Sequence, residues 1–197
     1  MGSCMARFKE FVKEDVLDRA VNLFWCKGYN GTSMEEVVTC LGISRSSLYD
    51  TFGDKRQLFL QALNRYRQQM SGAMIAMVNQ SEATLPTIKH LFAVAVQESL
   101  DSKLSKGCFI VNTTIELAAH DPEIARIVNA NMQDVEDAFY QAVKRGQEKG
   151  ELSTKHDARA VARFLFNNVS GIRVAAKSGA DQTVYNDIVS VVMSILN

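Results

Sequence analysis

Apolar residues recur at every third or fourth position along almost the whole chain, and this spacing constrains the fold more than any other feature. It places apolar side chains on one side of an α-helix, whereas a strand needs strict alternation, which is rare here. Only two prolines occur in the chain. We therefore expect an all-α protein of about nine helices. The expected helices are residues 12–27, 34–41, 45–51, 55–79, 84–100, 105–119, 122–150, 153–177 and 181 to the end.

Composition places this pattern in an ordinary globular protein. The chain has 197 residues, 47% of them hydrophobic, and a chain of this length buries roughly 70% of its unfolded surface, in one large domain or two small ones. Lys and Arg number 22, as do Asp and Glu, so no overall field favours nucleic acid, membrane or an acidic partner. No apolar run reaches the roughly 20 residues that span a bilayer, and we expect a cytoplasmic location.

Cysteine and histidine positions argue against a disulfide framework and against a metal site. The cysteines form no CxxC pair, have no histidine at metal-site spacing, and the histidines are scattered. These residues are Cys4, Cys26, Cys40, Cys108, His90, His120 and His156. We therefore expect neither a metal nor another cofactor.

The segment GISRSSLYDTF, residues 42–52, follows a short predicted helix and indicates a helix-turn-helix. Gly42 suits the turn because glycine tolerates positive φ, and Ser44 can cap the helix that follows. With Ile43 and Leu48 facing inward, the leading polar residues are exposed, where arginine can read a guanine edge and hydroxyls can bind bases or phosphates. We expect DNA contacts from Thr32, Ser33, Ser44, Arg45, Ser46, Ser47, Tyr49 and Lys55.

The charge around this segment is weakly positive. Residues 42–67 contain five basic residues and two acidic ones, which are Arg45, Lys55, Arg56, Arg65, Arg67, Asp50 and Asp54. This excess is consistent with DNA binding, but a solvated charged face is the alternative interpretation.

The stretch GYNGTSMEEVVTCLGISRSSLYDTFGDKRQLF, within residues 12–60, resembles the DNA-binding domain of the TetR/AcrR family of transcriptional regulators. The matching features are the aromatic after Gly28, the cap at Thr32 and Ser33, the GIS turn, the LYDTF motif and Lys55 at the start of the next helix. The resemblance implies a homodimer that represses transcription through an operator in double-stranded DNA and is controlled by a small-molecule inducer. We expect a three-helix DNA-binding domain at residues 1–53 and a helical ligand-binding and dimerisation domain at 54–197.

The last two predicted helices have the composition of a dimer interface. The helix at 153–177 is apolar on more than one side, which requires a second covering surface, and the last helix carries an apolar stripe. Paired with its copy, each chain would donate two helices to a four-helix bundle. The alternative is a monomer in which these are core helices. The expected interface residues are Phe164, Phe166, Val184, Ile188 and Val192.

Inward positions of the middle helices are candidates for a ligand pocket, although ordinary core packing is the alternative for each. Methionine side chains adapt to irregular apolar shapes and suit a pocket that accepts varied ligands. The candidates are Met70, Met74, Met77, Phe92, Val96, Cys108, Asn112 and Phe139.

Cys108 is the candidate for a reactive thiol. It follows SKG near the predicted start of the helix at 105–119, where the helix dipole and Lys103 and Lys106 would raise its reactivity. Electrophiles or oxidants would then modify Cys108 and release DNA. The alternative is a small buried hydrophobic residue. We expect Cys26 and Cys40, within the apolar pattern of the DNA-binding domain, to be inert.

Catalytic motifs are missing from the sequence. There is no glycine-rich phosphate loop, no HExxH and no GxSxG. Glu116 and His120 share a helix face, but surface roles are more common for such a pair, and Asp121 suits a helix cap. We therefore do not expect an enzyme. The remaining alternative is a helical small-molecule binding or carrier protein without operator-specific DNA binding.

Overall fold

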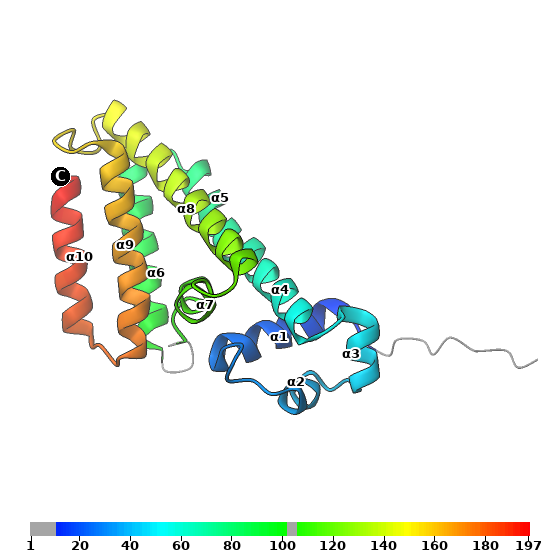
Figure 1. Ribbon diagram of the computed structural model, residues 1–197. Helices are drawn as coiled ribbons and strands as arrows, with labels where there is room; N and C mark the ends of the chain where they lie inside the picture. The colour runs from blue at the N-terminus through cyan, green and yellow to red at the C-terminus, as the bar shows by residue number, and fades with distance from the viewer. Residues whose placement is uncertain (1–10, 102–105) are drawn as a thin grey trace, which may run out of the picture. The chain divides into compact units, whose positions relative to one another are not determined.

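The computed structural model describes residues 11–101 and 106–197, and these residues form helices and no strands (Figure 1). The prediction of an all-α protein is confirmed. The chain divides into two compact units, the first ending at Arg65 and the second beginning at Tyr66. None of the helices in the described ranges is long and apolar enough to cross a membrane.

The first unit contains the predicted helix-turn-helix. Its helices begin and end close to the predicted positions because local caps set their starts. Ser33, Ser44 and Asp54 each accept a hydrogen bond from the backbone N–H three residues further on, at 3.2, 3.1 and 2.7 Å. The helices are α1 (Lys13–Lys27), α2 (Met34–Leu41), α3 (Arg45–Phe52) and α4 (Lys55–Tyr66).

Aromatic packing and an ion pair join α4 to the first unit. The Phe59 ring meets Phe24 edge-on with centroids 5.1 Å apart, and it meets Tyr29 at 5.0 Å. The Arg65 guanidinium donates to both carboxylate oxygens of Asp18, at 2.5 and 2.7 Å. The compact unit therefore extends to Arg65, past the boundary between residues 53 and 54 that we expected, because α4 covers the same core as α1.

The second unit holds the remaining helices. The longest, α8, packs against α5, α7 and α9, while α6 packs against α9 and α10 (Figure 1). These elements are η1 (Arg67–Ser71), α5 (Gly72–Gln80), α6 (Thr84–Leu100), α7 (Phe109–Leu117), α8 (Pro122–Glu148), α9 (Ala158–Lys177) and α10 (Gln182–Leu196).

The helix expected at 55–79 is interrupted by a π-helical turn, η1. Apolar spacings of three and four residues do not distinguish a continuous α-helix from one that contains a π turn. Helical dihedral angles at Tyr66 and Gly72 nevertheless keep the backbone helical on both sides of η1. Met70 and Ser71 lie on this turn.

Two other helices begin later than expected. The helix expected at 105–119 begins at Phe109, because Gly107 adopts a φ of 72° and Cys108 is extended; residues 102–105 lie outside the described part of the chain. The helix expected at 153–177 begins at Ala158, because the Ser153 N–H donates to the carbonyl of Leu196 at 2.9 Å. The first start therefore depends on the conformation of the loop before it, and the second on a contact distant in sequence.

Candidate DNA-binding surface and ligand pocket

Helix α3 divides into a buried side and an exposed side. Leu48 is fully buried and Phe52 is 3% exposed. Arg45, Ser46 and Tyr49 are exposed, as the sequence predicted for DNA-contacting residues. The Arg45 guanidinium lies over the Tyr49 ring, 6.0 Å from its centroid. An arginine and an aromatic ring are therefore presented together at the leading end of the helix.

The turn between α2 and α3 sets the position of α3. Gly42 has a φ of 64°, and its N–H donates to Val38 and Thr39 carbonyls at 3.0 and 3.3 Å. The Ser44 hydroxyl, which caps α3, also lies 2.9 Å from the hydroxyls of Ser46 and Ser47. The three serine hydroxyls thus form one small cluster beside Arg45.

Two predicted DNA contacts before α2 are engaged within the protein. Thr32 is 1% exposed, and its hydroxyl donates to the Gly28 carbonyl at 2.6 Å. A contact between the Thr32 side chain and DNA is therefore ruled out in this conformation. Ser33 is exposed, but it forms a capping box in which its N–H donates to Glu36 at 2.8 Å.

Lys55, also predicted to contact DNA, is half-buried against the loop that follows α1. Its ammonium donates to the Tyr29 carbonyl at 2.6 Å and lies 4.3 Å from the centroid of the Tyr29 ring. The weak positive excess of this region is also partly compensated, because Arg65 pairs with Asp18. Arg45 is the basic residue of α3 that remains exposed.

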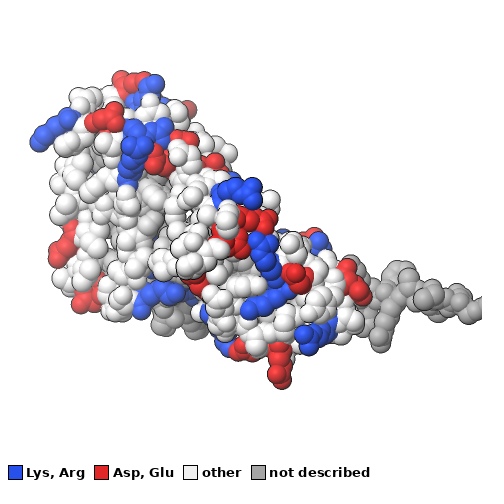
Figure 2. All heavy atoms as spheres, viewed as in Figure 1, with Lys and Arg blue, Asp and Glu red and all other residues white. Residues whose placement is uncertain are grey.

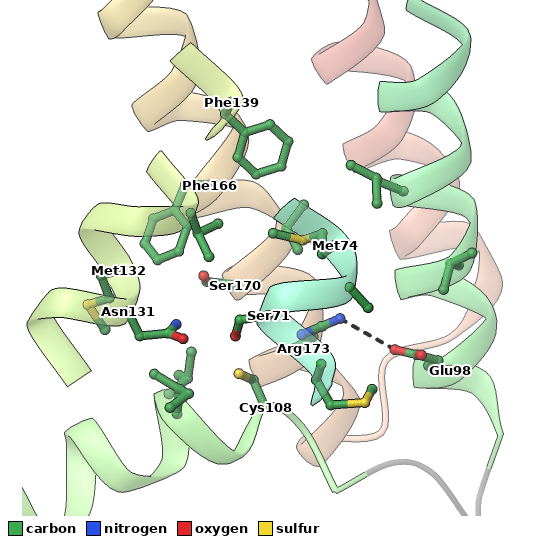
Figure 3. A pocket seen from close by; sticks show the side chains of 18 of the residues that line it. Ser71, Met74, Glu98, Cys108, Asn131, Met132, Phe139, Phe166, Ser170 and Arg173 are labelled. Atoms are coloured by element: carbon green, nitrogen blue, oxygen red, sulfur yellow. Dashed lines mark hydrogen bonds and ion pairs between the residues drawn. The ribbon is translucent and has the colours of Figure 1, made fainter. Parts of the chain in front are cut away.

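The second unit contains a cavity of about 190 Å³ between α5, α6, α7, α8 and α9 (Figure 3). Of the predicted pocket residues, Met70, Met74, Met77, Cys108 and Phe139 line it. The others do not: Phe92 and Val96 are buried in the surrounding core, and the Asn112 amide donates to the Lys106 carbonyl at 2.9 Å. Phe166, which we expected at a dimer interface, also lines the cavity.

Polar side chains line the cavity on the side away from Phe139, from Asn131 and Ser170 near Phe166 across to Arg173 and Glu98 (Figure 3). Arg173 donates to a Glu98 carboxylate oxygen at 3.4 Å. Burial opposes the charge of Arg173, but neighbouring groups, among them the Glu98 carboxylate, outweigh burial and raise its pKa. The guanidinium therefore stays charged in the cavity wall.

Cys108 receives a hydrogen bond from Tyr66, whose hydroxyl donates to its sulfur at 3.7 Å, and Arg173 lies in the same cavity wall. Burial, reinforced by Cys108, raises the pKa of Tyr66 well above its usual value, so the phenol stays protonated. Cys108 lies just before α7 and not within its first turn, and Lys103 lies outside the described residues. The groups around the sulfur thus come from α4 and α9.

Asn131 and Arg173 were missed by sequence reasoning, although the sequence contains a signal for each. Asn131 lies three residues after Val128 and four before Val135, on the buried side of α8. Arg173 lies between Val169 and Ala176 on the buried side of α9. The signal for Asn131 and Arg173 is a polar residue at a position where the helical period predicts an apolar one.

The cysteines of the first unit, which we expected to be inert because they lie within its apolar pattern, are not buried. Cys26 and Cys40 are both exposed, because the apolar sides of α1 and α2 that pack into the core do not include them. Their inertness therefore cannot follow from burial.

The expected dimer residues differ in exposure. Val184 is 44% exposed, Ile188 and Phe164 are half-buried, and Val192 is 1% exposed. Val192 is therefore a core residue of its own chain. Val191 beside it is 59% exposed. On the face shown in Figure 2, uncharged side chains cover most of the surface over α9 and α10.

Comparison with known proteins agrees with this arrangement. A model of the bacterial regulatory proteins of the tetR family matches residues 16–62, and a model of the tetracyclin repressor-like C-terminal domain matches residues 84–192. The uncharacterized HTH-type transcriptional regulator YezE of Bacillus subtilis is 37% identical over 194 residues, which cover 98% of this chain and 100% of YezE. The chain belongs to the TetR family.

Other relatives share this TetR family fold. The HTH-type transcriptional repressor ComR of Escherichia coli is 28% identical over 175 residues, covering 88% of this chain and 83% of ComR. A solved structure of a cysteine mutant of the TetR family regulator CifR, complexed with 26-bp operator DNA, has a TM-score of 0.84 and 22% identity. It covers 98% of this chain and 100% of that one. The chain is a helix-turn-helix DNA-binding transcriptional regulator.

Proposed function

We propose that this regulator is a homodimeric repressor that leaves its operator when a small molecule occupies the cavity or a thiol-reactive compound modifies Cys108. The observation that carries the proposal is the exposed end of α3, where Arg45 and Tyr49 project beside the serine cluster. Arg45 reads a base edge, and Tyr49 and the serine hydroxyls contact the phosphate backbone. Ser33 and Lys55 contribute mainly by holding α2 and α4 in place.

The dimer positions two copies of α3 on successive turns of DNA, about 34–36 Å apart. Its interface consists of the exposed apolar positions of α9 and α10, with Val174 42%, Val184 44% and Val191 59% exposed. Exposed apolar side chains on two neighbouring helices suit a self-complementary interface.

The conformational change that releases DNA begins at the cavity and is passed to α4 through η1. Met70 and Ser71 belong to η1 and line the cavity, and η1 directly follows α4 in the chain. A ligand that prefers a different arrangement of η1 by a few kcal/mol shifts the population away from the DNA-binding form.

Arg45→Ala tests the DNA-binding assignment. The operator is first selected from random double-stranded DNA, and affinity is then measured for operator and random sequence. Arg45→Ala should lose about 1–3 kcal/mol and relax preference at one position, whereas Tyr49→Ala should weaken both sequences alike. Arg126→Ala, which removes an exposed charge from α8, is the matched control. Equal losses on both sequences for Arg45→Ala contradict its base-reading role, and no sequence preference in the wild type supports a carrier protein.

The thiol assignment requires a protein in which Cys108 is the sole cysteine, because Cys26 and Cys40 are exposed. Serine replaces Cys4, Cys26 and Cys40. The thiolate is the reacting form, and the Tyr66 hydroxyl donates to the sulfur. N-ethylmaleimide should then release operator DNA from this protein and not from the same protein carrying Cys108→Ser. Release from both would show that Cys108 is not the sensor.

A further inference from the structure

The size of the cavity limits its ligand to a small molecule. Its volume is about 190 Å³, and an apolar protein cavity of about 150 Å³ holds one benzene molecule. The wall is apolar around Phe139, Phe166 and Met74, with flexible methionines that can adjust to a ring. A single substituted aromatic ring therefore fits the enclosed part of the cavity.

The cavity also contains an unused hydrogen-bond acceptor. Asn131 is 4% exposed and lines the cavity, and its amide points inward (Figure 3). Within the described residues, no hydrogen-bond partner reaches its Oδ1 atom. A buried acceptor without a partner costs free energy, which a ligand carrying an O–H or N–H group would recover.

The charges in the cavity wall favour a neutral ligand. Arg173 is already paired with Glu98, so an anion would compete with the carboxylate and a cation would face the guanidinium. Ser71 and Ser170 supply hydroxyl groups that can donate or accept. Neutral polar groups can thus be accommodated without breaking the ion pair.

We propose that the cavity binds a neutral single-ring phenol, with the ring between the apolar side chains and the phenolic O–H donated to Asn131 Oδ1. This inference rests on the proposed function, since it takes the cavity as the effector site. A phenol has a pKa near 10 and stays neutral at pH 7.

Calorimetric titration of the full chain without DNA tests this assignment with four probes of similar size. They are p-cresol, which donates; 4-methylanisole, which only accepts; toluene, which does neither; and p-toluate, which is anionic. p-Cresol should bind about 5- to 100-fold more tightly than toluene and 4-methylanisole. Equal affinity for toluene or 4-methylanisole, tighter binding of p-toluate, or no binding of p-cresol would overturn the proposal.

Asn131→Leu should bring the affinities for p-cresol and toluene close together, because it removes the acceptor and keeps a similar volume. Asn129→Leu, at an exposed position of the same helix, should keep the wild-type preference. Circular dichroism checks folding of both variants, and the probe series on the wild type stands if Asn131→Leu does not fold. Because these titrations contain no DNA, a failed operator assay would refute the proposed function while leaving the phenol assignment intact.

Discussion

Replacing Lys55 with methionine should destabilise the first unit by about 2 kcal/mol. The Lys55 ammonium donates to the Tyr29 carbonyl at 2.6 Å and lies 4.3 Å from its ring centroid. A hydrogen bond to a charged group contributes about 1.5–3 kcal/mol and a cation–π contact about 0.5–1 kcal/mol near the surface. Because Lys55 is half-buried, the lower ends of these ranges apply. Methionine keeps the aliphatic stem and removes only the charge.

Urea unfolding followed by tryptophan fluorescence measures this loss directly. Trp25 is the single tryptophan of the chain and lies in α1, so its signal reports the first unit. With a slope of about 1–2 kcal/mol per molar urea, the midpoint should fall by about 1–2 M. In a Tyr29→Leu background, Lys55→Met should cost about 0.5 kcal/mol less, because the ring is absent and the carbonyl remains.

An unchanged midpoint would refute this reasoning. If Lys55→Met unfolds like the wild type but loses affinity for operator and random DNA alike, the ammonium contacts phosphate, as the sequence first indicated. Lys144→Met, an exposed position of α8, is the control for the substitution itself.

Four further substitutions test other contacts. Hydrogen bonds from Lys27 and Ser33 lower the pKa of Glu36 from 4.5 to about 2. The carboxylate therefore stabilises α2 above pH 4.5, and this contribution disappears as the pH falls toward 2. Glu36→Gln should flatten the dependence of the urea midpoint on pH between these values, and an unchanged dependence would contradict this. Tyr185 is fully buried and its hydroxyl has no hydrogen-bond partner within the described ranges, so Tyr185→Phe should raise stability by about 1 kcal/mol in thermal unfolding, whereas a loss would indicate a partner. Val191→Glu should convert the dimer to a monomer in light scattering with an unchanged circular dichroism spectrum, while Val192→Ala should cost about 2 kcal/mol of stability; a dimer that persists in Val191→Glu would refute the interface.

The ligand pocket shows how far helical periodicity leads. Spacing put Met70, Met74 and Met77 on one side of the helix expected at 55–79, and all three line the cavity, Met70 from η1 and the other two from α5. Phe92 occupies an equally inward position but packs into the core. Periodicity gives the direction of a side chain around its helix axis, but whether the space there is filled depends on the neighbouring helices.

Sequence alone determined the features that depend on residues close together in the chain. The all-α class, the caps at Ser33 and Ser44, the turn at Gly42 and the exposed end of α3 each depend on residues within a few positions of one another. A hydroxyl can reach the backbone N–H three residues on whatever the rest of the molecule does, so these features could be predicted.

Only the tertiary structure decided which inward or polar side chains were already engaged. Lys55 meets the Tyr29 carbonyl, 26 residues away in the chain, while Val192 is covered by its own chain and Val191 is not. Such partners are brought together by the packing of helices. This packing depends on the apolar area that the whole unit buries, and no short segment encodes it. The acceptor of Asn131 and the ion pair of Arg173 with Glu98 were brought into the wall of one cavity for the same reason.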